Sequence, residues 1–193
     1  QLGNSNTSSV FGSPQQVSGF TSGGADVAAG YGHTCALTTA GAVLCWGWNG
    51  YGQLGRDTHL NNSESYIPGN VTGLQSGGTS ITAGYLHSCA VVNGAAWCWG
   101  DNSSGQLGAI TTLVADDENS VPIRVTGLSE GVTSIATGEQ FTCALVAGGV
   151  KCWGYNGDGQ IGDGGGWRTT PLGVIGLSIS RSYLYIPLLL RNP

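Results

Sequence analysis

The chain has 193 residues, a length typical of one domain, and contains 35 glycines, six cysteines and no methionine. Only 9% of its residues are charged and the formal net charge is −5, which gives no electrostatic basis for binding nucleic acid or an anionic membrane. No stretch approaches the ~20 consecutive apolar residues of a membrane span, and no window has apolar residues at helical spacing. Short apolar runs between glycines instead predict an all-β chain of short strands and tight turns.

The opening residues 1–3, Gln-Leu-Gly, return as the same triplet at 53–55 and 106–108 and as Gln-Ile-Gly at 160–162. The sequence therefore begins inside a repeated unit. Because it starts at Gln1 and lacks methionine, we expect a secreted chain from which a signal peptide has been removed.

Three copies of one longer pattern follow, at residues 30–55, 84–108 and 138–162. Each copy opens on glycine, carries two cysteines and ends with one of these triplets. The first cysteines of successive copies are 54 residues apart, and such a period is typical of repeat architectures. We call the copies cores and the segments between them links, with outer links at 1–29 and 163–177. The sequence thus predicts a repeat domain over 1–177.

Each repeat predicts four short strands, best seen around the third core. The first strand precedes the opening glycine (132–136), and the next two run through the cysteines (142–145 and 150–153). The fourth follows the proline of the link, as in residues 123–125 after Pro122. Proline is tolerated at the first residue of a strand because no ladder donor is lost there.

The six cysteines fall two to a core, at equivalent positions. The pairs are Cys35 and Cys45, Cys89 and Cys98, and Cys143 and Cys152. An even count, regular placement and a secreted type of chain favour three disulfides over reduced, buried thiols. A zinc site is the weaker reading, because eight or nine residues separate the cysteines of a pair and the third core lacks the nearby histidine.

In an antiparallel hairpin, directly opposed residues have numbers with a constant sum, so each cysteine pair locates the centre of its own turn. The turn sequences found at these centres support pairing within each core. The second pair centres its turn on Asn93-Gly94, the preferred dipeptide of a type I′ hairpin. The first pair centres a three-residue loop on residues 39–41, which ends in the glycine that a bulged loop requires. The third pair centres on Ala147-Gly148, a poorer turn dipeptide. Each bridge would stabilise the fold by ~2.5–3 kcal/mol.

Most of the length variation and charge lies in the links, between each triplet and the next proline. Repeat proteins place binding function on such loops, so loops 56–67 and 109–121 are candidate contacts for a surface glycan or a protein ligand. Ordinary solvent-exposed loops would have the same composition. Acceptor sequences for N-glycosylation lie in or beside the links, at Asn6, Asn61, Asn70 and Asn102.

His33 and His87 each precede a core cysteine by two residues, and Phe141 takes this position in the third core. A repeated histidine favours a packing or hydrogen-bonding role over catalysis. Residues 156–163 faintly resemble a calcium loop but lack its spaced acidic ligands. The sequence has no nucleophile elbow and no phosphate-binding loop. We therefore expect no catalytic site, no metal and no cofactor.

The core pattern Gly-x-x-His-Thr/Ser-Cys-Ala, then Cys-Trp-Gly-x-Asn-x-x-Gly-Gln-Leu-Gly, then Pro-x-x-Val-x-Gly-Leu, strongly resembles the regulator of chromosome condensation repeat over residues 1–177. The resemblance implies β-propeller blades, each a four-stranded sheet, in a family that usually closes a ring of seven. It does not imply the founding member's nucleotide exchange on the GTPase Ran, because that protein is nuclear and chromatin-bound, whereas this chain has paired cysteines and no basic tail. Secreted bacterial members look closer, and one secreted relative inhibits β-lactamase.

Three cores are fewer than half of such a ring, so we expect three four-stranded blades of about 54 residues in an incomplete or open array. Both ends carry a link, so the array cannot close by joining complementary half-blades. Head-to-tail contacts that do not close build filaments. We therefore expect a secreted structural subunit that binds identical subunits in an extracellular filament or cell-surface appendage. The alternative is an extracellular binding module, either an adhesin or an inhibitor-like fragment of a larger propeller.

The tail, residues 178–193, lies outside the repeats and is the most apolar run of the chain. Its large apolar residues are Tyr183, Leu184, Tyr185, Ile186, Leu188, Leu189 and Leu190. We expect residues 182–190 to act as a donor strand that packs into a neighbouring subunit through backbone hydrogen bonds. A cap on the chain's own third blade and a secretion signal are the two alternatives.

Overall fold

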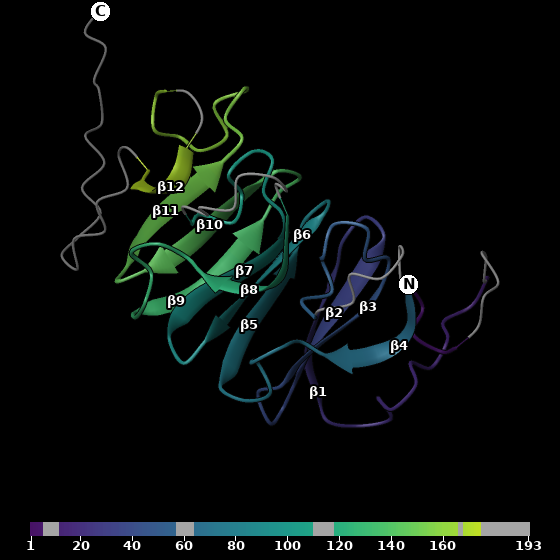
Figure 1. The fold of residues 1–193 in the computed structure, drawn as a ribbon. Coiled ribbons are helices and arrows are strands. Elements are labelled where there is room, and N and C mark those ends of the chain that lie inside the picture. Colours follow the sequence, from purple (N-terminus) through teal and green to yellow (C-terminus); the bar gives the residue numbers. More distant parts are fainter. Residues whose placement is uncertain (6–11, 57–63, 110–117, 166–167, 175–193) are drawn as a thin grey trace, which may run out of the picture.

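The computed structural model describes residues 1–5, 12–56, 64–109, 118–165 and 168–174. These residues form twelve β-strands, which are arranged as three four-stranded antiparallel sheets in chain order. Figure 1 shows the sheets side by side as an open array, with the first sheet at one end and the third at the other. The all-β, three-blade architecture predicted from the repeats is confirmed. No helix in the described part of the chain has the length and apolarity of a membrane span.

Each blade is a simple meander. The first consists of β1 (Gly24–Ala29), β2 (His33–Thr38), β3 (Val43–Gly47) and β4 (Ser65–Asn70). The second consists of β5 (Gly78–Ala83), β6 (His87–Val92), β7 (Ala95–Asp101) and β8 (Glu118–Arg124). The third consists of β9 (Val132–Thr137), β10 (Phe141–Val146), β11 (Gly149–Gly154) and β12 (Arg168–Gly173).

The central hairpin of every blade has the predicted register. Directly opposed cysteines join β2 to β3, β6 to β7 and β10 to β11, and each pair forms a disulfide, Cys35–Cys45, Cys89–Cys98 and Cys143–Cys152. The turn residues Asn93 and Gly94 have φ of 52° and 75°, the left-handed pair of a type I′ turn. Ala147 and Gly148 adopt the same turn with φ of 49° and 79°, although alanine is strained there. The disulfide prediction is confirmed.

The prediction for the fourth strand was wrong in its start. Pro68, Pro122 and Pro171 lie inside β4, β8 and β12 rather than at their first residues. In each blade the ladder to the third strand shifts register beside the proline. Proline fits because this strand is the outer edge of the sheet, where an N–H donor can be absent without breaking an inner ladder.

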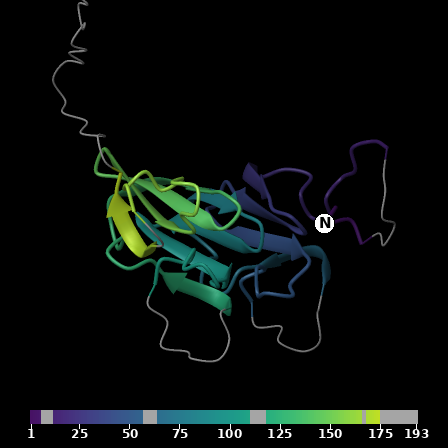
Figure 2. The same cartoon turned by 90° about the horizontal axis from the view of Figure 1, so that it is seen from above.

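The hydrophobic cores lie between blades rather than within one sheet. The inner strand β5 lies against β1 and β2 of the first blade, and β9 lies against β5 and β6 of the second. The turned view in Figure 2 shows the blades stacked in this way. One core lies between the first and second blades and the other between the second and third. Each blade therefore has a front face toward the next blade and a back face toward the preceding one.

The two faces carry different residues in every repeat. Front faces carry the disulfide and an aliphatic residue of the second strand, which is Leu37, Val91 or Leu145 in the three blades. Back faces carry a tryptophan, an inner-strand aliphatic residue and the middle residue of the Gln-Leu-Gly triplet that precedes the blade. For the second blade these are Trp99, Ile81 and Leu54, all buried.

Candidate functional site

The junction between the first and second blades is organised by one backbone carbonyl, that of Gln53. The indole Nε1 of Trp99 donates to this oxygen at 2.9 Å and the Ser88 hydroxyl donates to it at 3.0 Å. His33 of the first blade approaches the same hydroxyl, with Nε2 2.8 Å from Ser88 Oγ. Because this carbonyl belongs to the loop after β3 and its donors to the second blade, it holds the two blades together.

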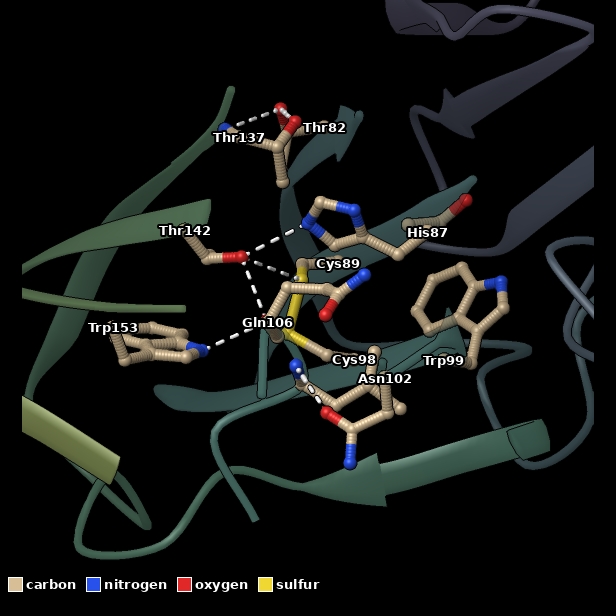
Figure 3. The surroundings of a disulfide bond; sticks show 12 residues. Thr82, His87, Cys89, Cys98, Trp99, Asn102, Gln106, Thr137, Thr142 and Trp153 are labelled. Atoms are coloured by element: carbon tan, nitrogen blue, oxygen red, sulfur yellow. Dashed lines mark hydrogen bonds between the residues drawn. A yellow bond between two sulfur atoms is a disulfide. The ribbon is translucent and has the colours of Figure 1, made fainter. Parts of the chain in front are cut away.

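The next junction repeats this arrangement (Figure 3). The carbonyl of Gln106 accepts from Trp153 Nε1 and from Thr142 Oγ1, both at 2.9 Å. His87 Nε2 lies 3.0 Å from the same Thr142 hydroxyl. The Cys89–Cys98 disulfide lies beside this cluster, with Sγ of Cys89 3.9 Å from Thr142 Oγ1. We call each carbonyl with its tryptophan, hydroxyl and histidine a junction node.

The two histidines serve these nodes as neutral donors. Since the Ser88 hydroxyl gives its proton to a carbonyl, His33 Nε2 carries a proton and donates to Ser88 Oγ. Burial lowers the pKa of His33 to about 4, and burial together with the charge of His33 lowers the pKa of His87 to about 3. A Cβ on Gly30 would lie 2.3 Å from His33 Cε1, so this glycine leaves room for the ring. The predicted hydrogen-bonding role is confirmed by this geometry.

The loop that carries the carbonyl is held by its own side chains. Asn49 Oδ1 accepts from the N–H of Leu54 at 2.9 Å, and Gln53 Oε1 accepts from the N–H of Tyr51 at 2.8 Å. The second repeat has the same bonds, from Leu107 to Asn102 and from Ser104 to Gln106. The Asn-x-x-Gly-Gln-Leu pattern is therefore a turn that aims a carbonyl at the next blade.

A different cluster lies at one end of the blades, on the loops after the first and third strands. Tyr31 and Tyr85 have ring centroids 4.4 Å apart, and Trp48 packs edge-on against Tyr51 at 5.6 Å. Glu139 is the third-repeat counterpart of the first two tyrosines, and its carbonyl accepts from the N–H of Tyr85 at 3.2 Å. We call Tyr31, Trp48, Tyr51, Tyr85 and Glu139 the tyrosine face.

Three members of this face, Tyr31, Tyr85 and Glu139, line a shallow depression of about 410 Å³ at the ends of the inner strands. Its floor is made of glycines, Gly30, Gly84 and Gly138, and its rim includes Tyr31 and Tyr85. Tyr31 is 68% exposed, an unusual position for a large aromatic ring. Burial against its neighbours raises the pKa of Tyr85, and the hydroxyl of Tyr31 and the charge of Glu139 act in the same direction.

The tyrosine face is not required by the blade fold. Its positions change from repeat to repeat: Trp48 is followed by Asp101 and Tyr155, and Tyr51 by Ser104 and Asp158. The neighbouring positions of Asn49, Gly52 and Gln53 keep the same residue in all three repeats. Sequence reasoning missed this site, although the 54-residue spacing of Tyr31 and Tyr85 was available as a signal.

The sequence-predicted contact and modification sites are only partly within the described residues. Several of them are outside the described residues: 57–63 and 110–117 of the two candidate binding loops, Asn6, Asn61 and the tail 178–193. Asn70 is exposed at the end of β4, and Asn102 is half-buried with its side-chain oxygen in the turn described above. Glycosylation at these asparagines stays a prediction.

The faint calcium-loop pattern near residue 160 has another role. Asp163 accepts from Asn156 at 3.0 Å and from Gly165 N at 3.1 Å, and it forms an ion pair with Arg168. The Gly165 N–H, Arg168 and Asn156 lower the pKa of Asp163, against an opposing effect of burial. Within the described ranges no group of three or more His, Cys, Asp or Glu residues is placed to hold a metal ion.

Comparisons with known proteins agree with this architecture. Two profiles of the regulator of chromosome condensation (RCC1) repeat match the chain, one at residues 25–53, 79–106 and 132–160 and the other at residues 40–91 and 93–145, more than half of its length. The probable E3 ubiquitin-protein ligase HERC4 of Homo sapiens is 39% identical over 140 residues, which cover 70% of this chain and 13% of HERC4. The ultraviolet-B receptor UVR8 of Arabidopsis thaliana is 33% identical over 142 residues, which cover 72% of this chain and 31% of UVR8.

Two solved structures share the fold. Prp20p of Saccharomyces cerevisiae superimposes with a TM-score of 0.69 at 20% identity, and human WBSCR16 with a TM-score of 0.66 at 23% identity. Each match covers 79% of this chain and 38% of the other. The chain thus spans well under half of the relatives and solved structures named here.

Proposed function

Because the chain belongs to the RCC1 repeat family of β-propeller blades, we propose that it is a non-enzymatic binding module and that the tyrosine face is its ligand face. One observation carries the proposal: the exposed Tyr31 and the half-buried Tyr85 line a depression together with Glu139, at a repeat position whose residue differs between the blades. Exposed tyrosine and tryptophan give large contact area at low entropic cost and are enriched at binding hot spots.

The ligand chemistry that this face favours is a protein segment with a basic side chain. Glu139 supplies a carboxylate on the rim, and tyrosine rings attract ammonium and guanidinium groups through cation–π contacts. The net charge of −5 favours the approach of such a partner. Among proteins that share this fold, Prp20p is described together with its binding to Gsp1p and histones.

An extracellular location fits this module, because disulfides persist in oxidising compartments, and three of them bridge its central hairpins. The chain would act there as an adhesin or inhibitor-like module. The filament and the donor strand stay predictions, since the tail lies outside the described residues.

A panned library of phage-displayed random peptides tests the proposal. For the peptides that bind the native chain, the affinity is then measured with the double variant Tyr31→Ser/Tyr85→Ser and with the single variant Tyr66→Ser. Tyr66 is an exposed tyrosine on the outer strand β4 and serves as the matched control. We expect the double variant to bind at least ~30-fold more weakly, the loss of a hot spot worth ~2 kcal/mol, and the control to bind normally.

Equal binding by all three proteins would contradict the proposal. A glycan array probed with the same proteins tests carbohydrate as the second class of ligand. Glycan binding that the double variant loses, without any peptide binding, would keep the face and replace the protein ligand with a carbohydrate.

A further inference from the structure

Tyr31 and Tyr85 form an aromatic pair that bridges the first and second blades. Their ring centroids lie 4.4 Å apart with an interplanar angle of 41°, which places the two rings in direct contact. Burial raises the pKa of Tyr85, and the charge and the hydroxyl of Tyr31 raise it further, so the two phenol oxygens lie near each other. The ring carbons next to these oxygens are therefore close as well.

The backbone holds both rings in place through equivalent turns. Tyr31 and Tyr85 each follow a glycine whose N–H donates at 2.9 Å to the carbonyl three residues ahead. The N–H of Tyr85 also donates to the carbonyl of Glu139 in the third blade at 3.2 Å. Tyr85 stays half-exposed although its own blade has a neighbour on each side. The pair is therefore a fixed and accessible feature of an internal junction.

The composition of the chain leaves few other side chains for an oxidant to attack. The sequence has no methionine, and all six cysteines are in disulfides, so the usual sulfur targets of oxidation are missing or already oxidised. Tyrosine and tryptophan rings are then the groups that lose an electron most readily. Because Trp46, Trp99 and Trp153 are buried, the tyrosine pair is among the accessible targets of a one-electron oxidant.

We propose that Tyr31 and Tyr85 are a site of oxidative cross-linking, at which hydrogen peroxide and a peroxidase join the two rings by a carbon–carbon bond. Each phenol loses one electron and its O–H proton and becomes a phenoxyl radical. The radicals couple at the ring carbons next to oxygen, and the hydrogen on each of these carbons moves to the phenol oxygen as a proton. The two electrons and two protons that were removed reduce one peroxide to two water molecules. The product is a dityrosine bridge between the blades.

The repeat pattern confines this bridge to one junction. The third repeat has Glu139 at the equivalent position, and a carboxylate has no phenol to couple. Each disulfide joins two strands of one blade, whereas the dityrosine bridge would link two blades covalently. The bridge depends only on the contact between the two rings, so this inference does not rest on the ligand proposed above.

Oxidation of the dilute full chain with peroxide and a peroxidase, followed by digestion and mass spectrometry, tests the site. Tyr31→Phe and Tyr85→Phe each remove one phenol but keep an aromatic ring for packing. Tyr66→Phe is the matched control, because Tyr66 is an exposed tyrosine on β4 and contacts no other tyrosine ring in the described part of the chain. Dityrosine fluorescence measures the yield in each protein.

We expect a peptide pair that joins positions 31 and 85 within one molecule, in the native chain and in the control. Each of the other two variants should lose this product. Oxidation in denaturant should lower its yield at least ~10-fold, because only the fold holds the rings in contact.

Three results would overturn the proposal. The first is cross-linking between molecules only, which dilution removes. The second is a bridge from Tyr85 to Tyr51 in place of Tyr31. The third is an equal yield of the 31–85 product in the folded and the denatured chain.

Discussion

The back faces of the first two blades carry nearly the same residues, and among the described residues only the second has a blade against it. Behind the second blade, Leu54 and Ile81 are sealed by the Cys35–Cys45 disulfide and Leu37 of the first blade. Behind the first blade, Leu2 and Val27 line a hollow of about 540 Å³. The comparison teaches that a blade of this chain is not a self-contained unit, because its stability depends on the neighbour, as in other repeat arrays.

The largest difference in unfolding free energy should come from truncating Leu54 and its counterpart Leu2. Leu54→Ala leaves a cavity in a sealed junction and should cost ~2–5 kcal/mol of unfolding free energy. Leu2→Ala removes a half-exposed side chain and should cost less than ~1 kcal/mol. Denaturant unfolding of both variants measures the difference. Equal losses would mean that the coverage by the first blade contributes little.

A second contrast separates the three disulfides. The Cys35–Cys45 and Cys89–Cys98 bridges are fully buried in junctions, whereas Cys143 is half-buried on the open front face. Mild reductant should therefore open Cys143–Cys152 first, at a cost of ~2.5–3 kcal/mol to the third hairpin. Alkylation and mass spectrometry at increasing reduction times give the order. Simultaneous opening of all three bridges would contradict it.

The junction nodes should also respond to pH, since both contain histidine. The pKa values of His33 and His87 are lowered to about 4 and about 3, so below pH 6.5 the unfolded chain binds protons that the folded chain does not. Stability is complete above pH 6.5 and falls by ~1.4 kcal/mol per pH unit for each histidine until its folded pKa is reached.

Chemical unfolding between pH 7 and 4 measures this slope. His33→Gln/His87→Gln retains a donor without the titration and should have a shallower slope. Identical slopes would show that other groups control the acid response.

The smallest effect concerns the hairpin turns of the second and third blades. Asn93 accepts a left-handed conformation readily, whereas Ala147 adopts φ of 49° under strain. Ala147→Asn should raise the melting midpoint by an amount equivalent to ~0.5–1 kcal/mol. Asn93→Ala should lower it by a similar amount, and a rise in both variants would contradict the turn assignment.

The blade hairpins could be predicted from sequence because their determinants are local. Cysteine positions, the turn dipeptide Asn93-Gly94 and the 54-residue period together specify register and pairing. The position of Pro122 inside β8 could not be read in this way, because a bulge at an outer edge depends on which strand lies outside. Alternation along a strand does not say which side has a neighbour.

The junction nodes and the tyrosine face were harder to predict because they join residues far apart in sequence. The junction node links His33 to Ser88 across 55 positions and depends on a backbone carbonyl, which has no sequence signal. Tyr31 and Tyr85 recur at the repeat spacing, but the third repeat has Glu139 there. A shared face became evident only when the blades were placed beside one another.

Hydrogen exchange of the inner strands tests most directly whether a back face is stabilised by the blade in front of it. In dilute solution β1, behind which no described blade lies, should exchange faster than β5, which is covered. Equal protection of β1 and β5 would contradict the account.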